Sequence, residues 1–433
     1  RLVRAFFFTY LYMKTLFPLF DETTGVCTDT RNIKLNCLFI ALKGDNFNGN
    51  EYAQVAIDKG AKYAIVDEKE KANNQNIFYV SNGLLFLQKL ANFHRHKFDI
   101  PVIGITGSNG KTSTKELIQT ILSTELNVLS TLGNLNNHIG VPLTLLRLNN
   151  DHNIAVIEMG ANQPNDIEEL CLIADVNAGI ITNIGKAHLE GFKNLEGVVK
   201  TKSALYHAVK KVNGILFYNA DDSILKPILP DNTENYSYGM TQANITGILH
   251  ELTPYISMSW SKKNYSSPTI ETKMIGKYNF YNFLAAICIG NHFGISQENI
   301  SKAISEYLPD NQRSQVQKTG KNTLIVDCYN ANPTSMSLAL ESFKLIDHNK
   351  KIAILGDMLE LGTNGIEEHK IVINYCIDNE IPFFTVGPLF KSIYETGFMN
   401  TNEIEKILAN IEDCLILLKG SRGIRLEKLI PVL

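Results

Sequence analysis

The stretch GITGSNGKTS, residues 104–113, decides the fold, because it places a glycine-rich turn directly between an apolar strand and a helix. Gly107 and Gly110 let backbone N–H groups converge on phosphate oxygens, and the start of the helix adds a favourable dipole. Lys111 would neutralise β- and γ-phosphate charge, and Thr112 would offer its hydroxyl to Mg2+. The predicted nucleotide ligands of this loop are Gly107, Ser108, Asn109, Gly110, Lys111, Thr112 and Ser113.

The spacing of this loop departs from the common phosphate-binding form. Gly107 and Gly110 are three residues apart, closer than in that form. A glycine-rich turn can be only a turn, but Gly-Lys-Thr between a strand and a helix favours nucleotide binding. The loop therefore predicts ATP or GTP as ligand and leaves the reaction open.

Outward from the loop, short apolar runs alternate with helical patterns, which favours an α/β fold with mostly parallel sheets. A chain of 433 residues is too long for one hydrophobic core. We expect a small N-terminal α/β domain (1–98), a central P-loop domain with a doubly wound parallel sheet (99–309) and a C-terminal Rossmann-like domain (310–433). The polar stretch 232–273 is predicted to be antiparallel, as an insertion or an edge sheet.

Composition excludes several classes of function. The formal net charge is −3, so the chain has no excess positive field to hold a nucleic acid. No apolar stretch reaches the length needed to span a membrane. The seven cysteines are scattered and never spaced as a C-x-x-C pair, which favours a reducing compartment and a cytoplasmic protein.

The N-terminus has two arginines before a short apolar run, as a signal peptide does. Lys14 breaks the run and no small-x-small cleavage site follows, so we expect a helix instead, with Leu11, Leu16 and Phe17 packed on the first domain. The chain begins with Arg, and we expect a displaced start, with residues 1–9 disordered or artefactual.

Two polar residues follow consecutive predicted strands after the loop. Glu158 ends the run IAVIE, and His188 comes after the next strand. Ligands of open α/β folds bind at the carboxyl ends of the strands, so Glu158 is a candidate Mg2+ ligand together with Thr112. A lone histidine is more often a surface or core residue, but the position of His188 favours a metal role.

Several sequence blocks resemble the Mur ligase family. The loop form Thr-Gly-x-x-Gly-Lys-Thr is similar to that of this family and of its folylpolyglutamate synthase relatives. Further blocks are similar to the branch of the family that adds D-alanyl-D-alanine to UDP-N-acetylmuramoyl-tripeptide. They are TLGNLNNHIGVPLT (131–144), EMGAN (158–162), TNIGKAHLEGF (182–192), YNANPTSM (329–336), GDMLELG (356–362) and KGSRGIRLE (419–427). The resemblance covers nearly the whole chain, from about residue 26 to 430.

The resemblance implies an ADP-forming amide ligase of peptidoglycan precursor synthesis that works through an acyl phosphate. Its substrates would be ATP, UDP-N-acetylmuramoyl-tripeptide and D-alanyl-D-alanine, with Mg2+ as cofactor. It implies catalytic roles for Lys111, Lys202 and His188, and metal binding by Thr112, Glu158, His188 and Lys202.

In similar ligases the lysine that matches Lys202 is carbamylated by CO2, which turns a cation into an anionic metal ligand. By itself Lys202 resembles a solvated helix lysine, and Lys200 is a neighbour on another side of the helix. The family usually has Glu two residues after that lysine, where this chain has Ala204. This departure weakens the carbamate assignment.

In the third domain, the resemblance implies that Arg313 and Asp327 hold the phosphate and ribose of ATP. Asn282 matches an asparagine that contacts adenine, although an amide in this position can also be a helix cap or simply exposed. Tyr278 departs from the family, in which many members have His at this position.

The remaining matches imply substrate contacts. Residues 28–31 and 39–49 match the UDP-sugar-binding region of the first domain, and the segments around Asn330 and Arg422 match the part of the third domain that binds the dipeptide. Ordinary turns remain the alternative for each. The predicted substrate-binding residues are Thr30, Arg31, Lys43, Gly44, Asn48, Gly49, Asn134, Asn136, Asn137, Asn183, Asn330, Asn332, Ser335 and Arg422.

Two other functions stay open at this point. One is another amide ligase of the superfamily, adding the third amino acid of the peptide or glutamate to folate. The other is a catalytically silent nucleotide-binding partner, which Ala204 favours and the retained Lys111 and Glu158 oppose. We expect a monomer whose domains close around the substrates. The diamino acid at the third peptide position is not encoded in any pattern that we can interpret.

Overall fold

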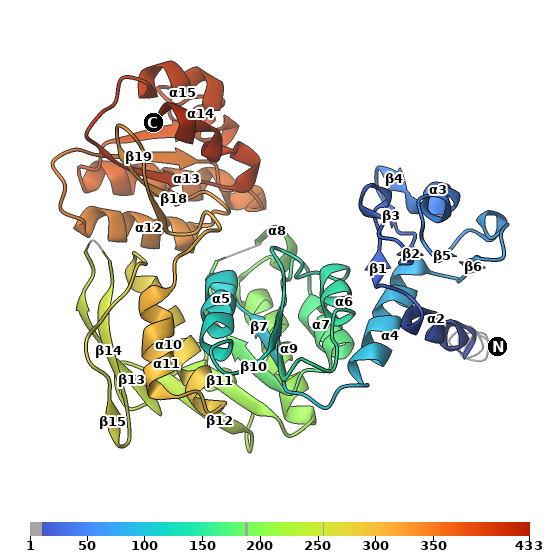
Figure 1. Cartoon of the computed structure of the whole chain (residues 1–433). Coiled ribbons are helices and arrows are strands. Elements are labelled where there is room, and N and C mark those ends of the chain that lie inside the picture. The colour runs from blue at the N-terminus through green and yellow to red at the C-terminus, as the bar shows by residue number, and fades with distance from the viewer. Residues whose placement is uncertain (1–10, 187–188, 254) are drawn as a thin grey trace. The chain divides into compact units, whose positions relative to one another are not determined.

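A computed structural model describes residues 11–186, 189–253 and 255–433 of the chain (Figure 1). His188, the predicted metal ligand, lies outside the described residues, as do residues 1–10. The chain forms two compact units. The first runs to Gly104 and includes residues 127–159 and 168–177, and the second comprises residues 105–126, 160–167 and 178–433.

The first unit begins with a helical segment, residues 11–16, followed by the short helix α2 (Pro18–Asp21). Leu16 and Phe17 are buried as expected, but Leu11 is 43% exposed, so its predicted place on the apolar face was wrong. Phe17 packs its ring against Phe86 and Phe93 of helix α4 (Gly83–Arg95), which anchors the N-terminal segment.

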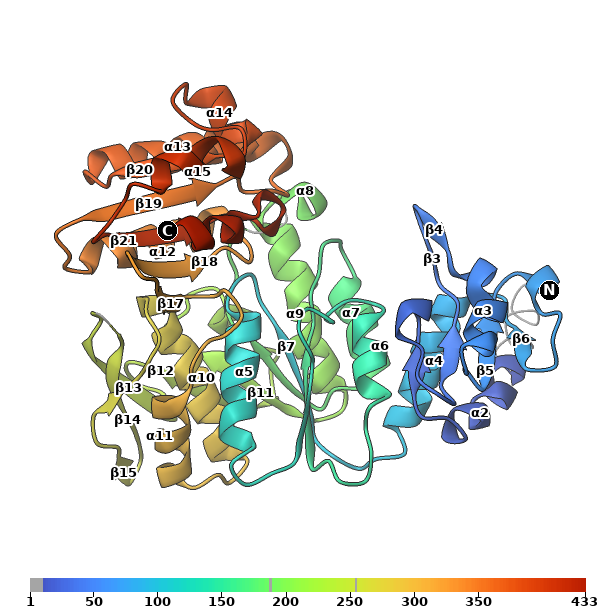
Figure 2. The same ribbon diagram turned by 45° about the horizontal axis from the view of Figure 1, so that its top comes forward.

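A four-stranded sheet of strand order β1-β2-β5-β6 forms the core of this unit, and all its neighbouring strands are parallel. The strands are β1 (Val26–Cys27), β2 (Leu38–Ile40), β5 (Tyr63–Val66) and β6 (Ile77–Tyr79), with α3 (Ala53–Asp58) between β2 and β5. Every residue of β2 is buried, which explains its continuous apolar run. The hairpin of β3 (Lys43–Gly44) and β4 (Phe47–Asn48) carries predicted substrate residues (Figure 2).

The largest sheet contains the phosphate loop. Its strand order is β15-β14-β13-β12-β11-β10-β7-β9-β8, with β16 (Ile270–Glu271) pairing β14. The loop follows β7 (Val102–Thr106), whose five residues are all buried, and leads into α5 (Lys111–Leu122). In the first unit β8 (Val128–Ser130) and β9 (Ile154–Glu158) are parallel, and α6 (Gly140–Leu145) contacts α4.

In the second unit, the strands β10 (Ala178–Ile181) and β11 (Ile215–Asn219) are parallel and are covered by α9 (Leu195–Lys211). The helix α10 (Lys277–His292) packs on β11, β12 and β13 and contacts α5. The other helices here are α7 (Asp166–Ala174), which spans the boundary of the units, α8 (Leu189–Phe192) and α11 (Gln297–Glu306).

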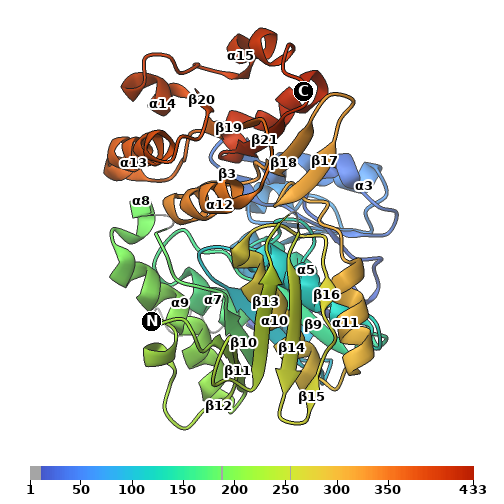
Figure 3. The same ribbon diagram turned by 90° about the vertical axis from the view of Figure 1, so that its left-hand side faces the viewer.

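The stretch 232–273 is only partly antiparallel, so its predicted arrangement needs correction. Strand β12 (Glu234–Gly239) is parallel to β11 and also to β13 (Ile245–Glu251). The change of direction comes later, where β14 (Ser257–Lys262) pairs antiparallel with β13 and with β15 (Tyr265–Ser266) (Figure 3). The polar residues of these strands are typical of an antiparallel ribbon exposed to solvent on both faces. Strand β12 nevertheless pairs with β11 through main-chain hydrogen bonds, and the side-chain pattern does not indicate such a pairing.

The last sheet has the strand order β17-β18-β21-β19-β20. Its parallel strands are β18 (Thr323–Asp327), β21 (Leu415–Lys419), β19 (Lys351–Gly356) and β20 (Phe383–Val386). The edge strand β17 (Gln315–Lys318) is antiparallel and was not predicted, since its residues are mostly polar. Helices α12 (Pro333–Leu345), α13 (Gly365–Asp378), α14 (Pro388–Ile393) and α15 (Thr401–Leu408) complete this part.

None of the helices in the described part of the chain combines the length and apolar character needed to cross a bilayer.

Candidate active site

The phosphate loop can accept only glycine at two positions. Gly107 has a φ of 149° and Gly110 a φ of 78°, conformations that L side chains rarely adopt. A Cβ on Gly107 would collide with the Thr182 hydroxyl, and one on Gly110 would come within 2.8 Å of the Asn282 amide oxygen. The sharp turn of the loop before α5 therefore depends on glycine at both positions.

Residues after β10 hold the loop in place. The backbone N–H of Asn109 donates to Asn183 Oδ1 (3.0 Å), and Asn183 Nδ2 donates back to the Asn109 carbonyl (2.9 Å). The hydroxyl of Thr182 donates to the same carbonyl, at 2.6 Å. Asn183 was predicted to bind substrate, and in the structure both ends of its amide bind the phosphate loop.

Two lysines come together at this loop. Lys111 Nζ donates to the carbonyl of Gly107 (2.8 Å), so its ammonium lies over the loop. Lys202 is 1% exposed, and its pKa lies well below the usual 10.5 because burial disfavours the charged amine and the Lys111 cation repels it. Lys202 is therefore not a solvated helix lysine, whereas Lys200 is exposed. A neutral buried amine is the form that CO2 can carbamylate.

Glu158 is the last residue of β9 and is 1% exposed. Asn136 Nδ2 donates to Glu158 Oε1 (2.8 Å), and the Glu158 N–H donates to the Thr131 hydroxyl (2.9 Å). Two predicted substrate residues thus bind other groups of the protein. Asn136 binds the Glu158 carboxylate, and Asn137 Oδ1 accepts a hydrogen bond from the N–H of Gly140 at the start of α6. Asn134 lies in the same loop and accepts the Asn136 N–H on its carbonyl.

The available donors fit Mg2+. This cation prefers oxygen ligands and usually binds through one or two carboxylates together with nucleotide phosphates. Thr112, which is 6% exposed, supplies a hydroxyl. Glu158, which is 1% exposed, supplies a carboxylate. Within residues 11–186, 189–253 and 255–433, there is no group of three or more His, Cys, Asp or Glu residues that could hold a metal ion. Thr112, in the second unit, and Glu158, in the first, each offer an oxygen of the kind that Mg2+ binds.

Asn282 lies inside α10, so it is neither a helix cap nor an exposed amide. The hydroxyl of Thr114, in α5, donates to Asn282 Oδ1 (3.1 Å), and Asn282 Nδ2 donates to Asn279 Oδ1 (2.8 Å). The amide of Asn282 is thus oriented by its neighbours, beside the backbone of Gly110. Ser113, next to Thr114, is also buried.

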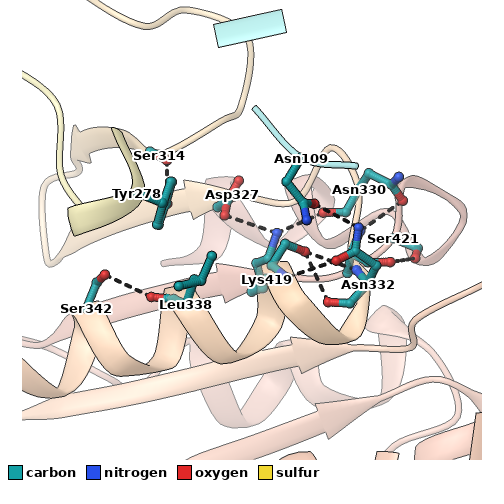
Figure 4. A network of polar contacts seen from close by, with 12 residues as sticks. Asn109, Tyr278, Ser314, Asp327, Asn330, Asn332, Leu338, Ser342, Lys419 and Ser421 are labelled. Atoms are coloured by element: carbon teal, nitrogen blue, oxygen red, sulfur yellow. Dashed lines mark hydrogen bonds and ion pairs between the residues drawn. The ribbon is translucent and has the colours of Figure 1, made fainter. Parts of the chain in front are cut away.

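Arg313 and Asp327 lie in the part of the second unit that contains β17 and β18. The guanidinium of Arg313 stacks over the Tyr329 ring, 4.1 Å from its centroid, and its Nε is buried with no hydrogen-bond partner among the described residues. Asp327 ends β18 and forms an ion pair with Lys419 (3.0 Å), whose ammonium also donates to the carbonyl of Asn330 (Figure 4).

The segment with Asn330 and Asn332 reaches the phosphate loop directly. Asn332 Nδ2 donates to Asn109 Oδ1 at 2.8 Å (Figure 4). The Asn332 oxygen caps α12 by accepting the Ser335 N–H (2.9 Å), and the Ser335 hydroxyl accepts the N–H of Asn332. Arg422 is exposed and lies 5.4 Å from the centroid of Tyr329. The predicted dipeptide segment and the phosphate loop are therefore neighbours.

In the first unit, several predicted substrate residues are held by carboxylates. Arg31 forms a bidentate pair with Asp29 and lowers the pKa of that carboxyl to about 2. Lys43 Nζ lies 3.3 Å from Asp67 Oδ1 and 3.1 Å from Glu68 Oε1.

Two more contacts hold this region. Asn48 Nδ2 donates to Glu68 (3.0 Å), and the backbone of Gly49 fits so closely under Leu42 that a Cβ would clash. Gly44 is exposed in β3, and Thr30 begins a short 3-10 turn. The sequence analysis did not single out Asp67 and Glu68, although they directly follow the apolar run of β5.

Comparison with known proteins places this geometry in a family. A protein of Bacillus subtilis named UDP-N-acetylmuramoyl-tripeptide--D-alanyl-D-alanine ligase is 33% identical over 437 residues, covering 95% of this chain and 94% of its own. A protein of the same name from Buchnera aphidicola is 37% identical, covering 94% and 92%. The chain belongs to the Mur ligase family.

Three Mur ligase models match successive parts of the chain. They are described as the Mur ligase family catalytic domain (residues 22–95), the Mur ligase middle domain (105–290) and the Mur ligase glutamate ligase domain (312–392).

Solved Mur ligase structures agree with these matches. The crystal structure of MurF ligase from Thermotoga maritima in complex with ADP has a TM-score of 0.85 at 26% identity, covering 95% of this chain and 97% of that one. A MurF structure from Acinetobacter baumannii has the same TM-score at 28% identity, with the same coverage of both chains. The predicted α/β class and three-domain Mur ligase fold are confirmed.

Proposed function

We propose that this protein is an ATP-dependent, ADP-forming amide ligase that joins D-alanyl-D-alanine to UDP-N-acetylmuramoyl-tripeptide in peptidoglycan precursor synthesis. The observation that carries the proposal is the hydrogen bond from Asn332 to Asn109. It places the segment proposed to bind the dipeptide directly beside the loop proposed to bind the ATP phosphates. The substrates named here are those in the names of the relatives from Bacillus subtilis and Buchnera aphidicola.

The first step activates the acid. A carboxylate oxygen of the tripeptide attacks the γ-phosphorus of ATP, a new P–O bond forms, and the bond to the β-phosphate oxygen breaks to release ADP. Lys111 and the backbone N–H groups from Gly110 to Thr112 would stabilise the charge on the phosphate oxygens. Arg313 would add a second cation, since its buried Nε has no partner among the described residues.

The second step forms the amide. The free amine of D-alanyl-D-alanine attacks the acyl carbon, a tetrahedral intermediate forms, the nitrogen loses a proton, and phosphate leaves with the electrons of the C–O bond. Asn330, Asn332 and Ser335 would place the dipeptide, and Arg422 would pair with its carboxylate. Holding the amine at the acyl carbon is worth effective molarities of ~10^5 M or more.

Mg2+, when bound, would supply Lewis-acid stabilisation of the phosphate charge. Thr112 and Glu158 would hold it, with His188 and a carbamylated Lys202 as further ligands. The burial of Lys202 and its lowered pKa support carbamylation, because the neutral amine is the reactive form.

The remaining assignments belong to the same proposal. Residues 1–98 would bind the UDP-sugar peptide through Thr30, Arg31, Lys43, Gly44, Asn48 and Gly49. Residues 99–309 would bind ATP, with Asn282 at the adenine, and residues 310–433 would bind the dipeptide and, through Asp327, the ribose. We further propose a cytoplasmic monomer. The seven buried cysteines, none of them in a disulfide, fit a reducing compartment, and sedimentation of the purified chain tests the monomer.

The direct test is a phosphate-release assay with ATP, Mg2+, UDP-tripeptide and D-alanyl-D-alanine, omitting each component in turn. Release that requires all four supports the ligase. Replacing the dipeptide by a diamino acid, or the UDP-tripeptide by a folate with glutamate as the amine, separates the related ligases. Binding of ATP without ADP formation when both other substrates are present would overturn the proposal in favour of a silent nucleotide-binding protein.

A further inference from the structure

Ser314 is held in an unusual backbone conformation by two side chains of α10. Its φ is 51°, in the left-handed region that residues other than glycine rarely occupy. The Tyr278 hydroxyl lies 2.6 Å from Ser314 Oγ (Figure 4). Asn279 Nδ2 donates to the same oxygen at 3.2 Å. Ser314 itself is 4% exposed, so water cannot replace these partners easily.

The direction of Arg313 depends on this contact. Arg313 lies between Gln312 and Ser314, and both neighbours have positive φ, 58° and 51°. Backbone conformations of this kind are costly and persist only where surrounding contacts hold them, so loss of a contact at Ser314 would let the backbone beside Arg313 relax. Arg313 has its guanidinium on the Tyr329 ring and a buried Nε without a hydrogen-bond partner in the described part of the chain. An anion would satisfy that donor.

A second set of contacts fixes the segment just before Arg313. Glu116, in α5, accepts hydrogen bonds on one oxygen from the Tyr307 hydroxyl (2.7 Å) and from Asn311 Nδ2 (2.6 Å). The connection from α11 to β17 is therefore hydrogen-bonded at two points. Asn311, before Arg313, binds Glu116, and Ser314, after Arg313, binds Tyr278. The only residues between these attachments are Gln312 and Arg313.

The Tyr278 contact is also continuous with the helix of the phosphate loop. Asn279 Nδ2 donates one hydrogen bond to Ser314 Oγ and another to the carbonyl of Ile275 (2.8 Å). Asn279 Oδ1 accepts a hydrogen bond from Asn282 Nδ2. Asn282 in turn accepts from the hydroxyl of Thr114, in α5. The helix that begins at Lys111 is thus connected to Ser314 through buried hydrogen bonds.

We propose that Tyr278 is a positioning residue for ATP, which acts by fixing Ser314 and so directing Arg313 toward the phosphates. The proposal rests on the proposed function in one respect, the assignment of Arg313 to the phosphates of ATP. It extends that function to a residue that has no assigned role. Burial and then the nearby Asp327 carboxylate raise the pKa of the Tyr278 phenol, so Tyr278 lies near a second proposed ATP ligand as well.

Equilibrium binding of MgATP to the full chain, measured by calorimetry without the other substrates, tests the proposal. Tyr278→Phe removes only the hydroxyl and is expected to weaken MgATP binding about 3- to 10-fold, the size of one lost hydrogen bond. Ser314→Ala removes this contact and also the one from Asn279, so it should give a loss at least as large. The double variant should bind no more weakly than Ser314→Ala, because that change already deletes the Tyr278 contact.

Tyr281→Phe is the matched control. Tyr281 lies one turn further along α10, and its hydroxyl donates to Asp221 (3.2 Å), outside this network. We expect its MgATP affinity to equal that of the unchanged chain. An equal loss in Tyr281→Phe, or unchanged affinity in both Tyr278→Phe and Ser314→Ala, would overturn the proposal.

A double-variant cycle tests whether Tyr278 acts through Arg313. In an Arg313→Ala background, Tyr278→Phe should cause no further loss of MgATP affinity. A loss that persists in that background would overturn the proposal, since Tyr278 would then act by another route. In steady-state assays the KM for ATP should rise while the KM for the UDP-tripeptide stays unchanged. The binding cycle decides the role of Tyr278 even if the phosphate-release assay rejects the ligase.

Discussion

The guanidinium of Arg313 lies 4.1 Å from the centre of the Tyr329 ring. The same ring lies 5.4 Å from the guanidinium of Arg422. One aromatic side chain therefore orients two cations, one proposed to bind phosphate and the other the dipeptide carboxylate. A cation over a ring is attracted by its quadrupole, which offsets part of the repulsion between two guanidinium groups that share it.

Replacing Tyr329 by Ala should raise the KM for both ATP and D-alanyl-D-alanine, each about 3- to 30-fold, because both arginines lose their support. Tyr329→Phe keeps the ring and should leave both constants close to the original. Steady-state kinetics with each substrate varied in turn measures this. A rise for only one substrate would mean that the ring does not support both arginines.

Replacing Lys111 by Ala should lower ADP formation by at least about 100-fold, since the cation at the proposed phosphate loop is lost. Binding of the UDP-tripeptide should be unchanged, because Lys111 lies outside residues 1–98, the region proposed to bind that substrate. Phosphate release and calorimetric binding are the two measurements. Turnover that survives the substitution would remove the phosphate loop from the mechanism.

Replacing Lys202 by Ala should abolish most of the ligase activity, and short-chain carboxylic acids should restore part of it by standing in for the carbamate. Lys200→Ala, on the same helix but exposed, is the matched control and should show neither effect. Activity with and without added acetate or propionate is measured for both variants. If Lys202→Ala has no defect and no rescue, the carbamate has no role.

Carbamylation of Lys202 should also depend on pH in a defined direction. Only the neutral amine reacts with CO2, and its fraction rises with pH up to the pKa of the amine. Because burial, and to a lesser extent Lys111, lowers this pKa well below 10.5, reactivation of CO2-depleted enzyme at fixed CO2 pressure should speed up with pH and level off well below pH 10.5. A rate that still rises at pH 10.5 would contradict a lowered pKa.

Two substitutions of Asn332 separate its two contacts. Asn332→Ser keeps a good cap for α12 but is too short to reach Asn109, so stability should be preserved while the KM for ATP rises a few-fold. Asn332→Ala loses the cap as well and should cost about 1 kcal/mol of stability. Thermal unfolding and ATP kinetics are compared for both. Unchanged ATP kinetics in both variants would show that the Asn332–Asn109 bond does not influence the phosphate loop.

Much of the fold could be predicted because its signals are local. The strands at 63–66 and 383–386 follow from the predicted alternation, since short apolar runs between turn residues indicate strands of a parallel sheet. The phosphate loop was equally clear, because its glycines serve a conformation set within a few residues. Strand β17 was missed because a polar edge strand has no such run.

The sequence by itself determined the alternation of strands and helices, the phosphate loop and the family blocks, all of which depend on neighbouring residues. Only the tertiary structure decided which polar side chains bind other parts of the protein. Asn183 binds the phosphate loop, Lys202 is buried beside Lys111, and the Tyr278 hydroxyl contacts Ser314. The physical reason is that a hydrogen bond such as the one between Asn332 and Asn109 joins residues 223 positions apart, and no periodicity along the chain encodes a contact of that kind.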